Sequence, residues 1–259
     1  MDRKSIQQRP TTAPRPPALE ALGLSRSYGE HLAVDNVSFE IFPGEVFGLL
    51  GPNGAGKTSL LRMLSGILEP DRGHARINGE RVTRDAHHLR RGLGYLSGDT
   101  SLYGRLSVVE MLTYFGQLHG MTKEQLDSRI DRMVNDFGLE SFKAQRCGAL
   151  SSGQSQRANL ARAFISNPKI VILDEPTVGL DVISGEFVVQ AIERARSERK
   201  AVLFSTHIMS EVDKLCDRIG LLLRGQLKAV GSRADLLKSF KVSDLSELIL
   251  SLHKEDHRP

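Results

Sequence analysis

Eight consecutive residues carry the most information in this chain: Gly51-Pro52-Asn53-Gly54-Ala55-Gly56-Lys57-Thr58. They follow a short apolar run, 46–50, and precede a helical pattern that we expect from about Lys57 to Leu68. This is the P-loop pattern in the strand–loop–helix setting that its chemistry requires. The sequence therefore predicts a site for a nucleoside phosphate.

Each residue type in this loop suits that purpose. Glycines let backbone N–H groups turn towards phosphate oxygens, the helix N-terminus adds partial positive charge, and Lys57 adds a full one. The hydroxyl of Thr58 is placed to contact Mg²⁺, with Ser59 as a neighbouring donor. The alternative is a glycine-rich turn that only caps a helix, and agreement at eight positions argues against it. A P-loop alone does not distinguish kinases, GTPases, helicases and transport ATPases.

A second apolar run, 170–173, ends in the adjacent carboxylates of Asp174 and Glu175. Such a pair is often only the solvated exit from a sheet. Paired with a P-loop, it predicts that Asp174 helps to hold Mg²⁺ and that Glu175 orients or deprotonates the attacking water. Lys57 and Glu175 are therefore catalytic candidates.

His207 ends a third apolar run, 202–206. A histidine at a strand end is more often a surface or capping residue. However, the carboxyl ends of parallel strands share one edge of a sheet, so His207 can emerge beside the phosphates. We expect it to contact the γ-phosphate, as a third catalytic residue.

Strand-like and helical patterns alternate along the rest of the chain. Two alternating segments, 19–25 and 32–41, predict an antiparallel, partly exposed sheet, and residues 107–167 have mainly helical periodicity. Strands at 170–173, 201–205 and 219–223 with helices at about 183–197 and 208–216 predict a covered parallel sheet, followed by a hairpin and terminal helices. The predicted organisation is a disordered leader at 1–17, one ATPase domain at 18–240 with a helical subdomain at about 99–167, and a C-terminal helix and tail at 241–259.

Composition limits the remaining possibilities. No apolar run approaches the length of about 18 residues that a transmembrane helix needs, so a pore has to come from another polypeptide. The two cysteines, Cys147 and Cys216, are too few for a disulfide framework. The 35 basic residues barely exceed the 31 acidic ones, so we predict no nucleic-acid partner; a basic surface beside an anionic membrane leaflet explains the excess equally well.

One further segment has no catalytic chemistry of its own, and it reads Leu150-Ser151-Ser152-Gly153-Gln154-Ser155-Gln156-Arg157. It offers the N-terminus of a helix, which attracts anions. It closely resembles the signature motif of ABC ATPases, whose usual form has glycine at the place of Ser152. With the P-loop, the Asp174–Glu175 strand, Gly179-Leu180-Asp181 and His207, the main motifs of that family occur in order over about 19–233.

This resemblance implies an α/β ABC ATPase fold: a P-loop (RecA-like) parallel-sheet core with an antiparallel β subdomain and a helical insertion. It also implies a head-to-tail dimer with a second copy or a related subunit, which encloses two ATP molecules. The residues implied at the nucleotide are Ser151, Ser152, Gly153 and Gln154 from the opposite chain, Asp181 between the sites, and Tyr28, which resembles the aromatic that stacks on adenine.

The sequence departs from the family at Gly98, where a glutamine that binds Mg²⁺ is usual. Glycine has no side chain to coordinate a metal, and Asp99 or a water molecule is the substitute that we expect. Hydrolysis is expected to survive this change, whereas the route that couples the nucleotide to the helical subdomain is in question.

The segments 95–121 and 204–218 resemble the NatA-type ATPase subunits of bacterial sodium exporters, which belong to the ABC-2 export type. The expected protein is peripheral, at the cytoplasmic face of the cell membrane, and powers export through a transmembrane permease. Sodium is one candidate cargo; a drug, a lipid or a polysaccharide is the alternative, because no sodium-binding chemistry is evident. A soluble, non-transport ABC ATPase and a subunit that binds ATP without hydrolysing it are the competing classes.

Overall fold

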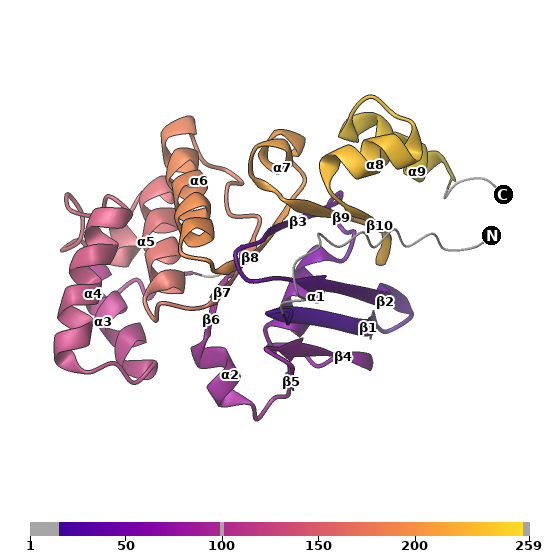
Figure 1. Cartoon of the computed structure of the whole chain (residues 1–259). Coiled ribbons are helices and arrows are strands. Elements are labelled where there is room, and N and C mark those ends of the chain that lie inside the picture. The colour runs from indigo at the N-terminus through magenta and orange to yellow at the C-terminus, as the bar shows by residue number, and fades with distance from the viewer. Residues whose placement is uncertain (1–15, 99–100, 256–259) are drawn as a thin grey trace.

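The computed structural model describes residues 16–98 and 101–255 of the 259-residue chain. The predicted leader, apart from Pro16 and Pro17, therefore lies outside the described residues, as do Asp99 and the last four residues. Figure 1 shows two sheets near the centre and a group of helices at the left. Among the helices of the described part, none is both long and apolar enough to cross a membrane.

A six-stranded sheet contains, in chain order, β3 (Val46–Leu50), β6 (Leu93–Leu96), β7 (Ile170–Asp174), β8 (Ala201–Thr206), β9 (Arg218–Leu223) and β10 (Gln226–Gly231). Its spatial order is β10-β9-β3-β8-β7-β6, and all neighbours pair in parallel except β9 and β10. Every residue of β3, β7 and β8 is buried, as expected for central parallel strands. The predicted parallel sheet is confirmed.

A smaller antiparallel sheet consists of β1 (Leu19–Tyr28), β2 (His31–Ile41), β4 (Arg72–Ile77) and β5 (Glu80–Arg81), in the order β2-β1-β4-β5. Buried residues alternate with partly exposed ones along parts of β1 and β2, which confirms the predicted sheet with one solvated face. The sequence patterns did not predict β4 and β5, because both are short and rich in charged residues. They are strands because β1 offers its second edge to β4.

The central sheet separates two apolar cores. Ile170 and Ile172 of β7 pack with α1 (Lys57–Leu64) and the antiparallel sheet, while Val171 and Leu173 pack on the opposite side with α6 (Val182–Ser197). Successive side chains of a strand point to opposite faces, so one apolar run supplies both cores. Helix α1 ends at Leu64, earlier than predicted, because the chain turns at Gly66 with a φ of 71°.

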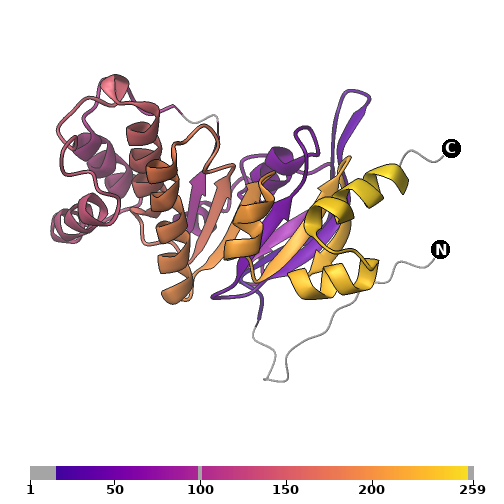
Figure 2. The ribbon, with the colours of Figure 1, turned by 90° about the horizontal axis from the view of Figure 1, so that it is seen from above.

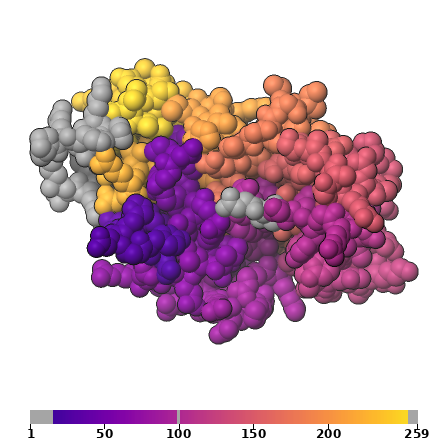
Figure 3. Space-filling model, turned by 180° about the vertical axis from the view of Figure 1, so that it is seen from behind, coloured from indigo at the N-terminus to yellow at the C-terminus, as the bar shows by residue number. Residues whose placement is uncertain are grey.

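The helical insertion contains α3 (Val108–Leu118), α4 (Lys123–Asp136), the 3₁₀ turn η1 (Cys147–Ala149) and α5 (Ser152–Phe164); the short α2 (His87–Arg91) precedes β6. Ser107, Thr122 and Ser151 cap α3, α4 and α5, and in each case the third helical residue closes a capping box. In Figure 3 the insertion, coloured magenta to salmon, lies at the opposite end of the molecule from the indigo strands.

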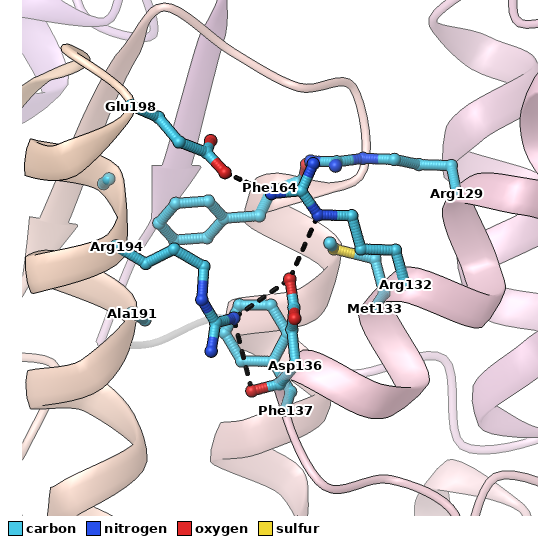
Figure 4. A pocket seen from close by; sticks show the side chains of 10 residues that line it. Arg129, Arg132, Met133, Asp136, Phe137, Phe164, Ala191, Arg194 and Glu198 are labelled. Atoms are coloured by element: carbon cyan, nitrogen blue, oxygen red, sulfur yellow. Dashed lines mark hydrogen bonds and ion pairs between the residues drawn. The ribbon is translucent and has the colours of Figure 1, made fainter.

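Ion pairs join this insertion to the core. Figure 4 shows Arg132 and Asp136 of α4 facing Arg194 and Glu198, which lie along α6 and at its C-cap. The Asp136 carboxylate lies 3.0 Å from Nη1 of Arg194 and 3.3 Å from Nε of Arg132. Arg132 also pairs with Glu198. These ion pairs connect α4 of the insertion to α6 of the core and oppose movement of one helix along the other.

The C-terminal segment covers the far end of the central sheet. Helix α7 (Met209–Leu215) precedes β9, and α8 (Arg233–Phe240) and α9 (Leu245–Glu255) follow β10. Leu236, Leu245, Leu248 and Leu252 bury their side chains in one cluster with residues of β9. Figure 2 shows these yellow helices at the end of the molecule away from the insertion.

Candidate functional site

The P-loop connects β3 to α1 and packs tightly against its neighbours. A Cβ on Gly51 would lie 2.2 Å from the carbonyl oxygen of Leu222, and one on Gly56 would lie 2.2 Å from that of Ala33. Gly56 also has a φ of 99°, which L side chains rarely adopt. Helix α1 has no side-chain cap and no acidic residue in its first turn, so its N-terminal N–H groups suit an anion.

Lys57 is buried at the centre of the loop. Its Nζ lies 2.8 Å from the carbonyl oxygen of Gly51, 3.0 Å from that of Pro52 and 3.0 Å from Oε1 of Glu175. The lysine thus links the P-loop to the end of β7, where the sequence placed the acidic pair. Its ammonium group is held where it can exchange a carboxylate for a phosphate oxygen.

The two acidic residues diverge after β7. Asp174 is buried and accepts a hydrogen bond of 2.6 Å from the hydroxyl of Ser205 on β8, whose oxygen in turn accepts the N–H of Glu175 at 2.9 Å. Glu175 has a φ of 47°, a left-handed conformation that is uncommon for this residue type. Its carboxylate therefore leaves the line of the strand and faces Lys57.

Ser205 was not among the predicted site residues. It pairs with Asp174 in the register of the two central strands, and the sequence signal was only its position just before Thr206 and His207. The hydroxyl satisfies one acceptor and one donor that would otherwise be buried without partners. It positions both carboxylates relative to each other.

His207 follows β8 and meets Glu175 at the same sheet edge. Its Nδ1 lies 3.6 Å from Oε2 of Glu175, and its side chain is partly exposed. The turn behind it is fixed by Thr206, whose hydroxyl accepts the N–H of Ile208 at 2.9 Å and donates to Glu211 at 2.6 Å. Three predicted catalytic residues, Lys57, Glu175 and His207, are thus brought together.

The predicted metal ligands are only partly described. Asp174 at the end of β7 and Thr58 in the first turn of α1 supply a carboxylate and a hydroxyl, which are hard oxygen donors of the kind that Mg²⁺ prefers. Asp99 lies outside the described residues. Across 16–98 and 101–255 no group of three or more acidic, histidine or cysteine side chains is arranged to hold a metal ion. The chain's donors therefore fit an ion that takes its other ligands from phosphates and water.

Gly98 lies beside the acidic pair. A Cβ at this position would be 3.6 Å from the carbonyl oxygen of Asp174, which is an ordinary contact. Space therefore does not require glycine here. On neighbouring β6, burial and the charge of Asp174 raise the pKa of Tyr95.

Tyr28 presents its ring beside α1. Its hydroxyl lies 3.3 Å from Oγ of Ser59, and the guanidinium of Arg26 lies 5.4 Å from the ring centroid. Arg26 is itself held by Asp71 at 2.8 Å. About half of the Tyr28 surface is exposed, so part of the ring is accessible to a ligand.

The signature residues lie elsewhere in the molecule. Figures 1 and 2 both place α5 well to one side of α1. Ser151 and Gln154 close the capping box at the start of α5, next to the exposed Ser152. The structure thus does not bring these residues to the P-loop of their own chain.

Helix α5 starts in close contact with the start of α6. A Cβ on Gly153 would lie 2.3 Å from Oγ of Ser184. Asp181 caps α6 by accepting the Ser184 N–H at 2.8 Å and its hydroxyl at 3.1 Å, and these hydrogen bonds lower the pKa of the Asp181 carboxyl. The signature segment and Asp181 therefore form one surface.

Large apolar side chains are exposed beside this surface. Val182 is 91% exposed and Ile183 is 77% exposed, both in the first turn of α6, and Val178 is half exposed just before it. Exposed apolar patches of this kind mark contact surfaces.

Comparison with known proteins gives a consistent result. Residues 34–178 match the family model described as ABC transporter. The chain is 38% identical over 220 residues to the ABC transporter ATP-binding protein NatA of Bacillus subtilis, covering 85% of this chain and 89% of that protein. It is also 38% identical over 231 residues to the Nod factor export ATP-binding protein I of Paraburkholderia xenovorans, covering 89% and 76% of the two chains.

Solved structures agree with the fold. An ATP-binding subunit of an ABC transporter superposes with a TM-score of 0.85 at 29% identity, over 91% of this chain and 99% of that one. The cassette MJ0796, in a dimeric post-hydrolysis state bound to ADP and phosphate, superposes with a TM-score of 0.75 at 26% identity, over 83% and 98%.

Proposed function

We propose, from the premise that this chain belongs to the ABC transporter ATP-binding family, that it powers export through a separate membrane-spanning permease. The chain is an ATPase of that family, with the family's fold. One observation carries the assignment of its catalytic residues. At the carboxyl edge of the central sheet, the Glu175 carboxylate lies 3.0 Å from Nζ of Lys57 and 3.6 Å from Nδ1 of His207.

In this proposal the P-loop N–H groups and the N-terminus of α1 bind the phosphates of ATP, and Tyr28 stacks on the adenine. Lys57 leaves Glu175 and pairs with the β- and γ-phosphates. Glu175 then orients a water molecule and takes its proton as the water oxygen attacks the γ-phosphorus and the bond to ADP breaks. His207 donates a hydrogen bond to the γ-phosphate.

Mg²⁺, held by Thr58, Asp174 and phosphate oxygens, would neutralise the charge that develops on the phosphates. Asp99 is proposed as a further ligand of this ion. The donor chemistry of the described residues supports the assignment, because Asp174 is buried at the end of β7 and, within 16–98 and 101–255, accepts one side-chain hydrogen bond, from the hydroxyl of Ser205. Its remaining lone pairs suit a metal ion or its water.

We further propose a head-to-tail dimer in which Ser151, Ser152, Gly153 and Gln154 of one copy reach the nucleotide of the other. The separation of α5 from α1 within one chain supports this arrangement, as do the exposed Val182 and Ile183. The related cassette MJ0796 is dimeric. Asp181 lies beside this surface and would couple the two sites.

Dimer capture tests hydrolysis and dimerisation together. Glu175→Gln keeps the size of the side chain but removes the base, so ATP is expected to hold the variant as a stable dimer in gel filtration. The wild type under turnover is expected to return to monomers. Equal persistence of both dimers would count against the catalytic role of Glu175.

For the permease contact we propose the surface around Tyr103 and Arg105. A groove of about 330 Å³ is lined there by Tyr103, Gly104, Arg105, Leu106 and Tyr114. The protein would sit peripherally at the cytoplasmic face of the membrane, with the groove against the permease.

Sodium is the proposed cargo because segments 95–121 and 204–218 resemble the NatA-type ATPase subunits of sodium exporters. A drug, a lipid or a polysaccharide is the alternative, and the relatives include a Nod factor export protein and a probable multidrug protein of Escherichia coli.

Copurification of the tagged chain from its native membranes, with growth of a deletion strain at raised sodium, tests this assignment. A polytopic partner together with sodium sensitivity is the expected result. A partner without sodium sensitivity would retain the motor and remove sodium as the cargo. Recovery with ribosomes or DNA and without any membrane protein would instead support a soluble ABC ATPase.

A further inference from the structure

The positive charge of this chain is concentrated in one short segment. Residues 72–91 contain six arginines and two carboxylates, so their net charge of +4 equals the net charge of the whole chain. The segment comprises β4, the edge strand β5 and α2, which Figure 1 places together at the lower edge of the molecule. We call its exposed arginines Arg76, Arg81, Arg84 and Arg91 the basic edge.

The pairing of two strands brings like charges together on this edge. Arg76 of β4 and Arg81 of β5 lie directly opposite each other, an arrangement that destabilises a sheet. Glu20 of β1 faces Arg76 from the other side, but among the described residues neither arginine forms an ion pair with any acid. The repulsion is therefore not compensated within the sheet, and a negatively charged surface outside the chain would relieve it.

An exposed aliphatic side chain stands beside the basic edge. Nη2 of Arg90 donates to the carbonyl oxygen of Arg84 at 2.9 Å, which fixes the turn between β5 and α2. The loop after α1 lies against this turn, because a Cβ on Gly66 would be 2.8 Å from Cγ1 of Val82 and 3.6 Å from Nη1 of Arg90. The next residue in that loop, Ile67, is 59% exposed.

We propose that the basic edge and Ile67 bind the anionic lipid headgroups of the membrane leaflet beside the permease. Arginine binds phosphate groups through parallel hydrogen bonds, and a cluster of four or more basic residues next to a membrane is typical of anionic-lipid binding. An exposed aliphatic residue can enter the boundary between headgroups and acyl chains. The inference deepens the proposed peripheral location and rests on the proposed function for its orientation.

The composition of the segment favours a lipid surface over a nucleic acid. Residues 72–91 contain no phenylalanine, tyrosine or tryptophan, whereas sites for single-stranded nucleic acids rely on aromatic side chains that stack on bases. The exposed Ile67 likewise has no favourable partner on a phosphodiester backbone. A leaflet offers both the negative charge and the apolar layer behind it.

The basic edge adjoins the proposed permease contact. Arg91, the last residue of α2, is close enough to His119 for its charge to lower the pKa of that ring. His119 is the C-cap of α3, and the same helix carries Tyr114 of the groove. A permease seated at the groove would therefore bring the basic edge towards the leaflet that surrounds the permease.

Vesicle flotation with the purified full-length chain tests the proposal without a permease. The wild type should float with vesicles of phosphatidylcholine and phosphatidylglycerol, but not with phosphatidylcholine alone. The triple variant Arg76→Gln, Arg81→Gln, Arg84→Gln should bind the mixed vesicles roughly a hundredfold more weakly, since each arginine near an anionic surface contributes roughly fivefold. Added salt should weaken binding of the wild type far more than binding of this variant.

A matched triple variant removes the same charge elsewhere. Lys214→Gln, Lys238→Gln, Lys241→Gln changes exposed residues on α7 and at the end of α8, which Figure 1 places at the upper edge, and it should bind as the wild type does. Both variants keep the basic residues of 1–17, so that segment does not account for a difference between them. In urea the arginine variant should unfold at the same or a higher concentration than the wild type, because the repulsion between β4 and β5 is removed.

A second pair of variants tests the apolar contact. Ile67→Ser should remove the part of vesicle binding that persists at high salt, because that part depends on buried apolar surface. Leu250→Ser on α9 is the control, since Leu250 is also 59% exposed, and it should leave this binding unchanged.

Four results would overturn the inference: equal vesicle binding by the wild type and the arginine variant, an equal loss in the lysine variant, equal binding to phosphatidylcholine alone, or tighter binding to RNA or duplex DNA than to the mixed vesicles. In each case a membrane protein that copurifies with the chain would leave the transporter assignment in place. Binding to the mixed vesicles as expected, with no membrane protein recovered from native membranes, would instead support the lipid contact and contradict the proposed permease.

Discussion

Ser205 organises the acidic end of β7 with one uncharged hydroxyl. It donates to the buried Asp174 and accepts the backbone N–H of Glu175, so it fixes a proposed metal ligand and a proposed base at once. Lys57 closes the arrangement by pairing with the Glu175 carboxylate. In the proposed mechanism a phosphate oxygen takes the place of this carboxylate at the lysine.

Ser205→Ala should therefore impair both stability and turnover. The variant leaves a buried N–H and a carboxylate oxygen without their partner, which costs about 1–3 kcal/mol. The ATPase rate should fall because Glu175 is less well positioned. Urea unfolding and steady-state hydrolysis measure the two effects, with Ser197→Ala, at an exposed position of α6, as the control. Unchanged values in both assays would contradict the role given to Ser205.

His119 makes stability depend on pH. Burial, with the charge of Arg91 as a smaller cause, lowers its pKa from the usual 6.5. The unfolded chain therefore takes up a proton first as the pH falls, so the stability that the neutral ring contributes is complete above pH 6.5 and is lost below it. His119→Gln should reduce the slope of the unfolding free energy against pH below pH 6.5. The exposed His31→Gln should keep it, and equal slopes in wild type and His119→Gln would refute the assignment.

At the scale of elements, α5 connects three surfaces of the molecule. Its N-cap, Ser151, begins the signature segment, Gly153 packs against the start of α6, and Arg162 lies over the Phe115 ring of α3. The ion pairs of Asp136 with Arg194 and of Arg132 with Glu198 hold neighbouring α4 to α6 and its C-cap. Helix α5 therefore contacts α6 at its start and α3 near its end.

The contact between α5 and α6 can be tested with a single methyl group. Gly153→Ala places a Cβ 2.3 Å from Oγ of Ser184, so either the Ser184 hydroxyl has to rotate or the helices have to separate, and rotation breaks the hydrogen bond to Asp181. We expect a loss of about 1–3 kcal/mol in unfolding free energy and a lower ATPase rate. Gly185→Ala on α6 meets no atom within 4 Å and should instead stabilise the chain by about 0.5–1 kcal/mol. Equal stability of the two variants would contradict this packing argument.

At the scale of the whole molecule, the two halves of the proposed nucleotide site lie on different parts of one chain. The P-loop, Glu175 and His207 lie at the sheet edge, whereas the signature segment lies in the insertion. The exposed Val182 and Ile183 adjoin the second half. A second copy in head-to-tail orientation would cover this apolar surface and complete both sites.

Ile183→Asp should abolish the ATP-dependent dimer while the monomer stays folded. The side chain is 77% exposed, and an acidic residue in the first turn of α6 is favoured by the helix dipole. Combined with Glu175→Gln, it should lower dimer formation at least tenfold in gel filtration with ATP. Leu250→Asp, at an exposed position on α9, should leave the dimer intact. Loss of the dimer in both variants would argue against this interface.

The sequence by itself determined the nucleotide chemistry and the fold class. The P-loop, the Asp174–Glu175 strand and the strand that ends in His207 were readable because local sequence specifies glycine turns, buried strands and helix starts. The parallel-sheet rule also placed His207 at the sheet edge where the phosphates were expected. Family resemblance, rather than local pattern, supplied the proposed roles of Tyr28, Asp181 and the signature segment.

Only the tertiary structure decided how distant segments meet. Strands β4 and β5 exist because β1 has a free edge, and the bridge through Ser205 depends on the pairing of β7 with β8. These features depend on contacts between residues far apart in the chain. Periodicity along the chain reports burial and local conformation, but it does not specify which buried polar groups will find partners.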